Sequence, residues 1–249
     1  MPFKFCVCWA NENWTRHWDG GEKELLVAQD YSETTLRAIA ADVHRYSTDS
    51  RYIRVNGRPM VLVYRPLLLP DPVAASELFR RAFKEQGIHL VYVESMEAVN
   101  RGVRPQDIGF DASVEFPPHG IAVPRTDHVT ALKEGWEGYR YDYKSTVVEA
   151  VMRQCAPYKR YPGAFATWDN TPRQPLKGTS FDDVTPEVFQ LYLEEKLEEA
   201  RCFLPNDERF LFINAWNEWA EGAHLEPDQR YGHRWLEAVR GALLSKGCL

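Results

Sequence analysis

The chain alternates short apolar runs with longer helical patterns, and this alternation limits the folds open to it. Six runs are typical of buried strands: residues 3–9, 60–64, 89–93, 110–116, 163–168 and 210–216. Between most of these runs, apolar residues recur at the three- and four-residue spacing of a helix. Regular alternation of strand and helix predicts a parallel sheet covered by helices, which is an α/β fold.

The predicted helices begin at recognisable capping residues. Ser32, Asp71 and Thr185 each precede an apolar stripe, and a proline follows Asp71 and Thr185 directly. Gly87 is expected to close the second helix. Acidic residues between Glu194 and Glu199 are expected to form a solvated helix face. The other expected segments are helices over 148–155 and 231–242, a short or irregular helix around 96–102, and a long loop over 117–142.

Two architectures fit such a series of strand–helix units, a doubly wound open sheet and a (β/α)8 barrel. No glycine-rich fingerprint follows the first run, which argues against dinucleotide binding. Instead nearly every run ends in polar or aromatic residues, as in a barrel whose functional rim is fed by all its strands. Only six units are found, whereas a barrel of this class needs eight. We therefore expect an incomplete TIM barrel, a single domain over residues 1–249 that lacks the first two units.

Composition and charge exclude several classes of function. With 30 basic and 36 acidic residues the net charge is −6, and there is no long basic run, so nucleic acid is not expected as a partner. The five cysteines fit neither a disulfide framework nor a zinc pattern, and His17 with Asp19 lacks a third ligand. No metal or other cofactor is therefore expected. The absence of a visible signal peptide or transmembrane segment predicts a cytoplasmic location.

The segment from Phe212 to Gly222 is the strongest indication of chemistry. Its apolar start leads into Trp, Asn and two carboxylates three residues apart, Glu218 and Glu221. Paired carboxyl groups among tryptophans suit glycoside chemistry, because one protonates the leaving oxygen while the other serves as base or nucleophile. Both acids face the same way only if the chain turns helically after the strand, so we expect such a turn near Asn217.

Other polar and aromatic residues at the ends of the runs are candidate sugar contacts. Trp14 and Trp219 lie past strand ends and are expected to be sugar platforms, whereas Trp9 lies on a strand where core packing is the alternative. Glu115 has a second interpretation as a structural ion-pair partner of Arg65. The predicted substrate-binding residues are Trp9, Asn11, Glu12, Asn13, Trp14, Arg65, Glu115, His119, Trp168, Asp169, Asn217, Trp219 and Glu226.

Four motifs in this order resemble the WbsX-type proteins, which carry a domain similar to glycoside hydrolase family 99. They are residues 5–16 (Phe-Cys-Val-Cys-Trp-Ala-Asn-Glu-Asn-Trp-Thr-Arg), 52–59, 114–119 and 215–222 (Ala-Trp-Asn-Glu-Trp-Ala-Glu-Gly). The resemblance covers essentially the whole chain. Family 99 enzymes are (β/α)8 barrels that act as retaining endo-α-mannosidases or endo-α-mannanases. The strand that opens the family, roughly Tyr-Leu-Pro-Gln-Phe-His, and the strand after it would precede Met1.

The resemblance also implies roles for the acids. Glu218 would act as base toward the sugar 2-hydroxyl and Glu221 as acid/base at the glycosidic oxygen, with a 1,2-anhydro sugar between the two steps. Family 99 has His where this chain has Ala220. The implied function is a retaining, endo-mannosidase-like glycoside hydrolase acting on an oligo- or polysaccharide.

Two alternatives stay open. The WbsX-type group is associated with bacterial surface polysaccharide synthesis, which favours a glycosyltransferase of O-antigen or capsule synthesis. A transferase often carries an Asp-x-Asp metal motif, and no such triplet occurs in this sequence. The second alternative is a non-catalytic glycan-binding or degenerate fragment.

Overall fold

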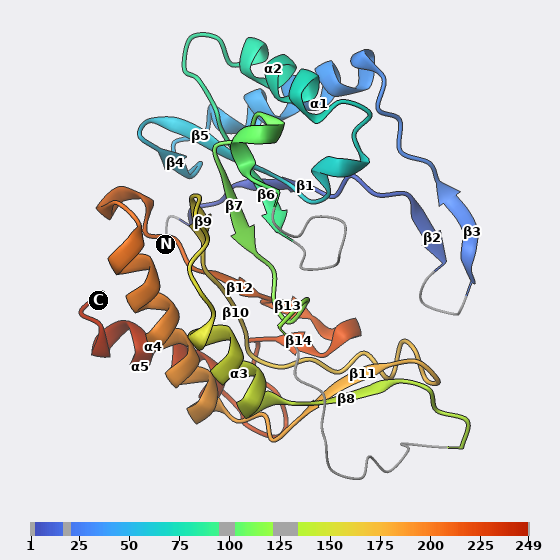
Figure 1. The fold of residues 1–249 in the computed structure, drawn as a ribbon, viewed down its shortest axis with the longest axis vertical. Coiled ribbons are helices and arrows are strands. Elements are labelled where there is room, and N and C mark those ends of the chain that lie inside the picture. The colour runs from blue at the N-terminus through green and yellow to red at the C-terminus, as the bar shows by residue number, and fades with distance from the viewer. Residues whose placement is uncertain (1–2, 17–20, 95–102, 122–133, 249) are drawn as a thin grey trace.

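Parallel strands form the central sheet and follow one another across it in the order of the sequence (Figure 1). The computed structural model describes residues 3–16, 21–94, 103–121 and 134–248. Each of the six predicted runs supplies a strand, so the predicted α/β series is confirmed. The strands are β1 (Val7–Trp9), β5 (Arg58–Val63), β6 (His89–Glu94), β7 (Ala112–Glu115), β9 (Arg160–Tyr161) continued by β10 (Gly163–Phe165), and β12 (Phe212–Asn214).

The sheet has the strand order of a barrel but is open. Among the described residues no pairing joins β12 to β1, so the ring does not close. This is the incomplete barrel that the sequence predicts. Because the strands are parallel, their carboxyl ends share one edge of the sheet, where the sites of such folds lie.

The sheet changes partner at Pro162. The short β9 before this residue pairs with β7, whereas β10 after it pairs with β12. Pro162 has no N–H to donate, although its carbonyl accepts the N–H of Phe212 at 3.0 Å. The N–H of Gly163 donates to the side chain of Glu115 on β7 at 3.0 Å, in place of a backbone carbonyl of a neighbouring strand. We call this place the Pro162 seam.

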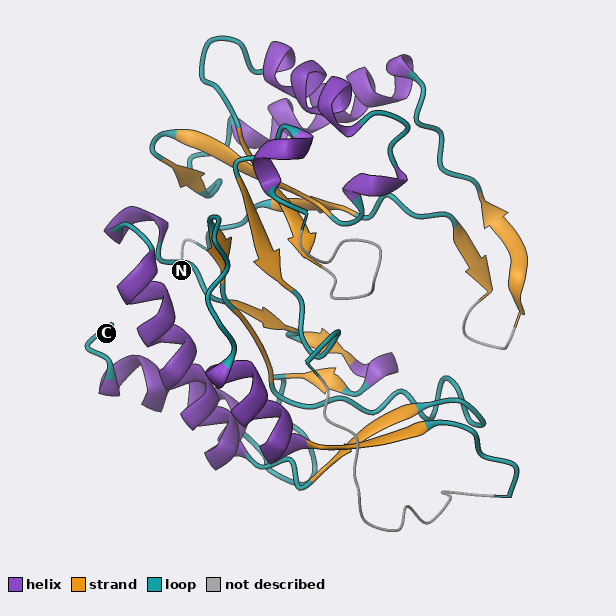
Figure 2. Ribbon diagram, viewed as in Figure 1, coloured by secondary structure: helices purple, strands orange, loops and turns teal. Residues whose placement is uncertain are grey.

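Helices pack on the sheet in two groups (Figure 2). The first contains α1 (Glu33–Ser47) and α2 (Pro72–Ala82), and the second contains α3 (Tyr143–Met152), α4 (Pro186–Phe203) and α5 (Arg234–Ser245). The side chains of Ser32, Asp71 and Thr185 cap α1, α2 and α4 as predicted.

Some helix boundaries differ from the prediction. The second helix ends at Ala82, and Gly87, with φ +65°, lies in the turn beyond it. α3 begins before its apolar pattern, at Tyr143, and ends at Met152, so the exposed Cys155 lies beyond it. α5 runs from Arg234 to Ser245, and Tyr231 packs on the core from the turn before it. The irregular helix predicted around 96–102 lies outside the described residues, and a 3-10 turn (η3) follows at Pro105–Ile108. No helix within the described ranges is both long and apolar enough to span a membrane.

The two faces of the sheet carry separate cores. Val61, Val63 and Leu90 pack with α1 and α2 on the outer face. Leu62, Val91 and Val114 pack on the opposite face, with Tyr161. This alternation follows from the two-residue side-chain period of a strand. A third core lies where α3, α4 and α5 pack against β10, and Phe165, Phe189 and Trp235 are almost fully buried there.

Several short strands were not predicted. They form a hairpin of β2 (Trp14–Arg16) and β3 (Gly21–Val27), a parallel ribbon of β8 (Tyr139–Asp142) and β11 (Thr179–Asp182), a hairpin of β13 (Asn217–Glu218) and β14 (Ala223–His224), and a two-residue β4 (Arg54–Val55) beside β5. Each is too short or too polar to give a clear apolar run. The second hairpin carries Glu218 of the functional segment described below, and the ribbon lies near it (Figure 1).

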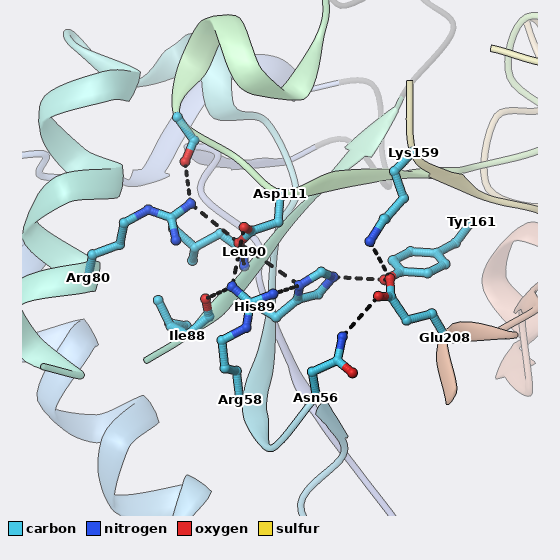
Figure 3. Close-up of polar contacts among 11 residues, drawn as sticks. Asn56, Arg58, Arg80, Ile88, His89, Leu90, Asp111, Lys159, Tyr161 and Glu208 are labelled. Atoms are coloured by element: carbon cyan, nitrogen blue, oxygen red, sulfur yellow. Dashed lines mark hydrogen bonds and ion pairs between the residues drawn. The ribbon is translucent and has the colours of Figure 1, made fainter. Parts of the chain in front are cut away.

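A polar network ties the strands together at their amino ends (Figure 3). His89 is fully buried, accepts a hydrogen bond from Arg58 at Nδ1 (3.2 Å), and contacts the Tyr161 hydroxyl through Nε2 (2.7 Å). Tyr161 in turn donates to Glu208, which also pairs with Lys159. Burial lowers the pKa of His89 to about 4, although Asp111 opposes this shift. The network lies at the end of the barrel that usually serves stability.

Candidate active site

The two acids of the functional segment lie on one short turn. After β12 the chain passes a cis Asn214–Ala215 bond, forms β13, and enters a 3-10 turn (η5) at Trp219–Glu221. The helical turn predicted near Asn217 is therefore present but starts at Trp219, with Glu218 at its N-cap. Glu218 is exposed, whereas Glu221 is partly buried.

Gly222 fixes this turn against the loop that follows β10. Its φ of +63° is in the left-handed region that favours glycine. A Cβ at this position would lie 2.7 Å from the backbone nitrogen of Asp169. The N–H of Asp169 donates to the carbonyl of Glu221 at 2.8 Å. The close backbone approach that glycine permits therefore sets where the Glu221 side chain begins.

Glu221 has an unusual electrostatic environment. Burial raises the pKa of its carboxyl, Arg173 opposes this effect, and the charge of Glu218 raises the pKa further. Arg173 Nη1 lies 3.1 Å from Glu221 Oε1, and both side chains are partly exposed. On balance the Glu221 carboxyl is more readily protonated than that of an ordinary glutamate. Arg173 remains beside it as a cation when the carboxyl is ionised.

Trp219 is held in place by two neighbours. Its indole Nε1 donates to Glu226 Oε2 at 2.7 Å, and one ring face stacks on His224 with centroids 4.0 Å apart. The side chain remains 48% exposed, so part of the indole is available to a ligand. Glu226, predicted as a sugar contact, here orients the indole.

The loops after β1 and β5 form a second group of predicted residues. The buried Asn11 side chain donates to the carbonyl of Arg65 and accepts its N–H, each at 2.7 Å. The Arg65 side chain pairs with Glu12 at 3.2 Å. Asn13 Oδ1 accepts the N–H of Gln29 at 2.8 Å, and Trp14 is 62% exposed. Asn11 therefore joins the two strand ends, whereas Glu12, Asn13 and Trp14 face outward.

Glu115 does not lie at the rim. It is buried on the helix-facing side of β7, and its carboxylate pairs with Arg160 and Lys196, each at 3.1 Å. The ion-pair interpretation therefore describes its surroundings, but the partners differ from the predicted Arg65. Alternation along β7 explains this position, because Glu115 and Val114 must point to opposite faces.

The remaining predicted residues occupy varied places. Trp9 packs with Tyr31 and Phe79 under the helices and does not face the interior of the barrel. His119 stacks on Phe116 and meets the edge of the buried Trp168. Asp169 is exposed, and its carboxylate caps the turn at Thr171. Asn217 is exposed and pairs with His224 across the hairpin.

Arg173 is the functional candidate that the sequence did not reveal. It lies 48 residues before Glu221 in a loop with no regular pattern, so no spacing rule connects the two residues. His17 and Asp19, which lack a third metal ligand in the sequence, lie outside the described residues. Within the described ranges, no group of three or more His, Cys, Asp or Glu side chains is arranged to hold a metal ion.

Comparison with known sequences identifies the family. The model of the family described as glycosyltransferase WbsX matches residues 1–239. The chain belongs to the WbsX family. Two curated relatives, both the uncharacterized protein WxcX of Xanthomonas campestris pv. campestris (strains B100 and ATCC 33913), are 41% identical over 247 residues. The matches cover 98% of this chain and 35% of each relative, so the chain spans about a third of their length.

Solved structures show the same fold in glycoside hydrolase-like proteins. One, titled a glycoside hydrolase-like protein, gives a TM-score of 0.60 at 12% identity. The match covers 86% of this chain and 62% of the chain in that structure. The GH99 endo-alpha-mannosidase from Bacteroides thetaiotaomicron gives 0.54 at 15% identity, with 87% and 62% covered. At such identities the likeness establishes the fold alone. It agrees with a family 99-like domain in a WbsX-family chain.

Proposed function

We propose that this chain is a carbohydrate-active domain and a retaining glycoside hydrolase, with Glu221 as acid/base and Glu218 as assisting base. One observation carries the proposal: a partly buried carboxyl with a raised pKa shares a turn with an exposed one. Membership in the WbsX family and the family 99-like fold support an enzyme that acts on glycans. In this proposal residues 1–249 work as one catalytic domain on an oligo- or polysaccharide.

The proposed reaction uses the sugar's own hydroxyl as nucleophile. Protonated Glu221 gives its proton to the glycosidic oxygen as the bond from C1 to that oxygen breaks. Glu218 takes the proton of the 2-hydroxyl, and the freed oxygen bonds to C1 to form a 1,2-anhydro sugar. Water then attacks C1 as the bond from C1 to O2 breaks: Glu221 takes a proton of the water, and Glu218 returns a proton to O2. Both carboxyls are restored, and the two inversions at C1 retain the configuration.

The surroundings of Glu221 suit both steps. Burial and the charge of Glu218 favour the protonated form that the first step needs. Arg173 stabilises the ionised form that acts as base in the second step. An acid/base residue works best when its pKa lies near the operating pH, and these opposing influences move Glu221 in that direction.

We further propose that Trp219 is a sugar platform beside the acids. Its indole is oriented by Glu226 and His224, so stacking a sugar on it costs little ordering of the side chain. Trp14, Asn13 and the Glu12–Arg65 pair lie at the ends of β1 and β5 and are proposed as further contacts.

The main rival is a glycosyltransferase, which the description of the family favours. A transferase would move a sugar from an activated donor and would depend on that donor for turnover. The measurement that separates the two is release of reducing ends from a glycan without any nucleotide sugar. Turnover that requires a nucleotide sugar would establish the transferase. Tight glycan binding without turnover in either assay would favour a binding module.

The acid pair is tested by three matched substitutions. Glu218→Gln and Glu221→Gln remove one carboxyl each, and Glu195→Gln on the exposed side of α4 serves as control. General acid–base groups contribute roughly 10²- to 10⁴-fold, so both pair variants should lose at least about 10²-fold in kcat/KM while the control stays unchanged. With an aryl glycoside whose phenolate leaves unprotonated, Glu221→Gln should recover more activity than Glu218→Gln. Unchanged hydrolysis in both pair variants would refute the assignment.

A further inference from the structure

A cavity of about 730 Å³ adjoins the turn that carries Glu221, yet neither Glu221 nor Glu218 lines it. Its walls come from the β8–β11 ribbon, the loop after β10 and the segment from Trp219 to Trp235. Trp219 and Asp169 belong both to the cavity wall and to the contacts of the catalytic turn. The volume falls within the range of roughly 300–1,000 Å³ that is typical of small-molecule sites.

The aromatic part of the wall is fixed by hydrogen bonds. Trp235 Nε1 donates to Asp228 Oδ2 at 2.7 Å, and the Tyr231 hydroxyl donates to the carbonyl of Val184 at 3.1 Å. The rings of Tyr231 and Trp235 meet edge to face with centroids 5.2 Å apart. Trp235 is almost fully buried and braces Tyr231, so the preformed aromatic surface that suits stacking by the apolar face of a sugar comes from the partly exposed Tyr231 and from Trp219 at the rim.

The charges in the wall disfavour an anionic ligand. Four aspartates line the cavity against two arginines, Arg140 and Arg230. Arg140 already pairs with Asp182 at 2.6 Å. Burial alone would raise the pKa of Asp228, but hydrogen bonds from His224, Tyr231 N–H and Trp235 lower it, so this carboxylate stays charged. A carboxylated sugar entering the cavity would meet excess negative charge.

Two polar atoms of the wall point to a ligand with hydroxyl groups. His224 Nε2 lies 3.0 Å from Asp228 Oδ2, and a neutral imidazole that donates to Asp228 keeps Nδ1 as a hydrogen-bond acceptor. Within the described structure neither this atom nor the donor Arg140 Nε has a partner, and both are covered, so a ligand reaches them only after a side-chain rotation. A hydroxyl both donates and accepts, whereas a carboxylate cannot donate to Nδ1 and an ammonium cannot accept from Nε.

We propose that this cavity is a glycan subsite for an uncharged sugar unit, reached past Trp219 while the rest of the glycan lies at Glu218 and Glu221. The inference rests on the proposed function, because it extends the same substrate beyond the acid pair. It predicts that a longer neutral oligosaccharide gains affinity once one of its units reaches the cavity. An oligosaccharide with a carboxylated sugar in that position should gain none.

Gln229 allows a matched test, because it lines the cavity, is exposed, and belongs to neither the acid pair nor its contacts. Gln229→Trp fills the cavity, and Gln229→Ala leaves it open. The probes are neutral manno-oligosaccharides of increasing length and oligogalacturonides of the same lengths. Their affinities are measured by calorimetry on each variant in the Glu221→Gln background, and KM is measured in the unmodified background.

The wild type and Gln229→Ala should bind the longer neutral chains about tenfold more tightly than the shorter ones, a step of roughly 1.4 kcal/mol, and Gln229→Trp should lose this gain. A gain that is identical in all three proteins overturns the inference and leaves the hydrolase proposal standing. Equal gain with oligogalacturonides overturns the preference for uncharged sugars. A length-dependent gain that Gln229→Trp removes, without turnover by the unmodified chain, supports the subsite and refutes the hydrolase. No glycan binding by any variant refutes the inference, while turnover in the unmodified background still decides the hydrolase.

Discussion

Replacing Gly222 by alanine should damage both the fold and the acid pair. Left-handed backbone costs a residue with a Cβ about 1–2 kcal/mol relative to glycine. The added Cβ would also lie 2.7 Å from Asp169 N and 2.8 Å from Asp169 O, and backbone atoms cannot rotate away as a side chain does. Overpacking of this kind adds roughly 1–3 kcal/mol. The free energy of unfolding should therefore fall by about 2–5 kcal/mol.

Gly232 provides the matched control. Its φ of +57° is similarly left-handed, but a Cβ there would meet nothing within 4 Å. Gly232→Ala should therefore show only the backbone cost of about 1–2 kcal/mol. Both substitutions also reduce the entropy of the unfolded chain, which offsets part of the loss equally, so their difference isolates the steric overlap.

Guanidinium unfolding at constant m-value measures the two free energies, and glycan turnover is measured on the same samples. Because the overlap must displace either Asp169 or the carbonyl of Glu221, Gly222→Ala should also lose activity while Gly232→Ala keeps it. Equal losses of stability in the two variants would show that the Asp169 backbone moves away from the added Cβ with no loss of folding free energy. The proposed locking of the turn by Gly222 would then be wrong.

Three further results are expected. Arg173→Met should raise the pKa of Glu221 and so move the alkaline limb of the pH profile of kcat to higher pH. Arg173→Lys keeps the positive charge and should leave that limb nearly in place, and the pH dependence of kcat in both variants tests this. Lys196→Met should cost about 3–5 kcal/mol by leaving Glu115 short of a buried partner, and adding Glu115→Gln should recover part of this in denaturant titrations. His89 takes up a proton below about pH 6.5 in the unfolded chain but only below about pH 4 in the folded protein. Lowering the pH from 6.5 to 4 should therefore reduce the free energy of unfolding of the wild type by about 3 kcal/mol more than that of His89→Gln.

The strand series was predictable because each central strand is buried on both faces and so appears as an apolar run. The helix starts were predictable because Ser32, Asp71 and Thr185 act locally, through their own hydrogen bonds. Contacts between distant segments were not predictable in this way. Arg173 reaches Glu221 across 48 residues, and only the packing of the loop after β10 against the turn brings them together.

The acidic stretch on α4 is a solvated face only in part. Glu195 is exposed as predicted, but Glu199 is partly buried and pairs with Lys196, which is 2% exposed and also pairs with Glu115. A helix turns about 100° per residue, so neighbours in such a stretch face different environments. The partner Glu115 comes from β7 and leaves no mark near α4 in the sequence. Its correct placement, away from the rim, required knowledge of which face of β7 is covered by helices.

The Pro162 seam has a consequence for motion. Backbone ladders run from β1 to β9 and from β10 to β12, but at Pro162 side chains join them: Glu115 accepts the N–H of Gly163, and Tyr161 and Lys159 contact Glu208. Cooperative units of native opening tend to follow such divisions. Amide hydrogen exchange should therefore resolve two units with different protection. The Asn11–Arg65 junction belongs to one unit and the Glu221 turn to the other, so hinging at the seam would change the distance between these two groups without breaking either ladder.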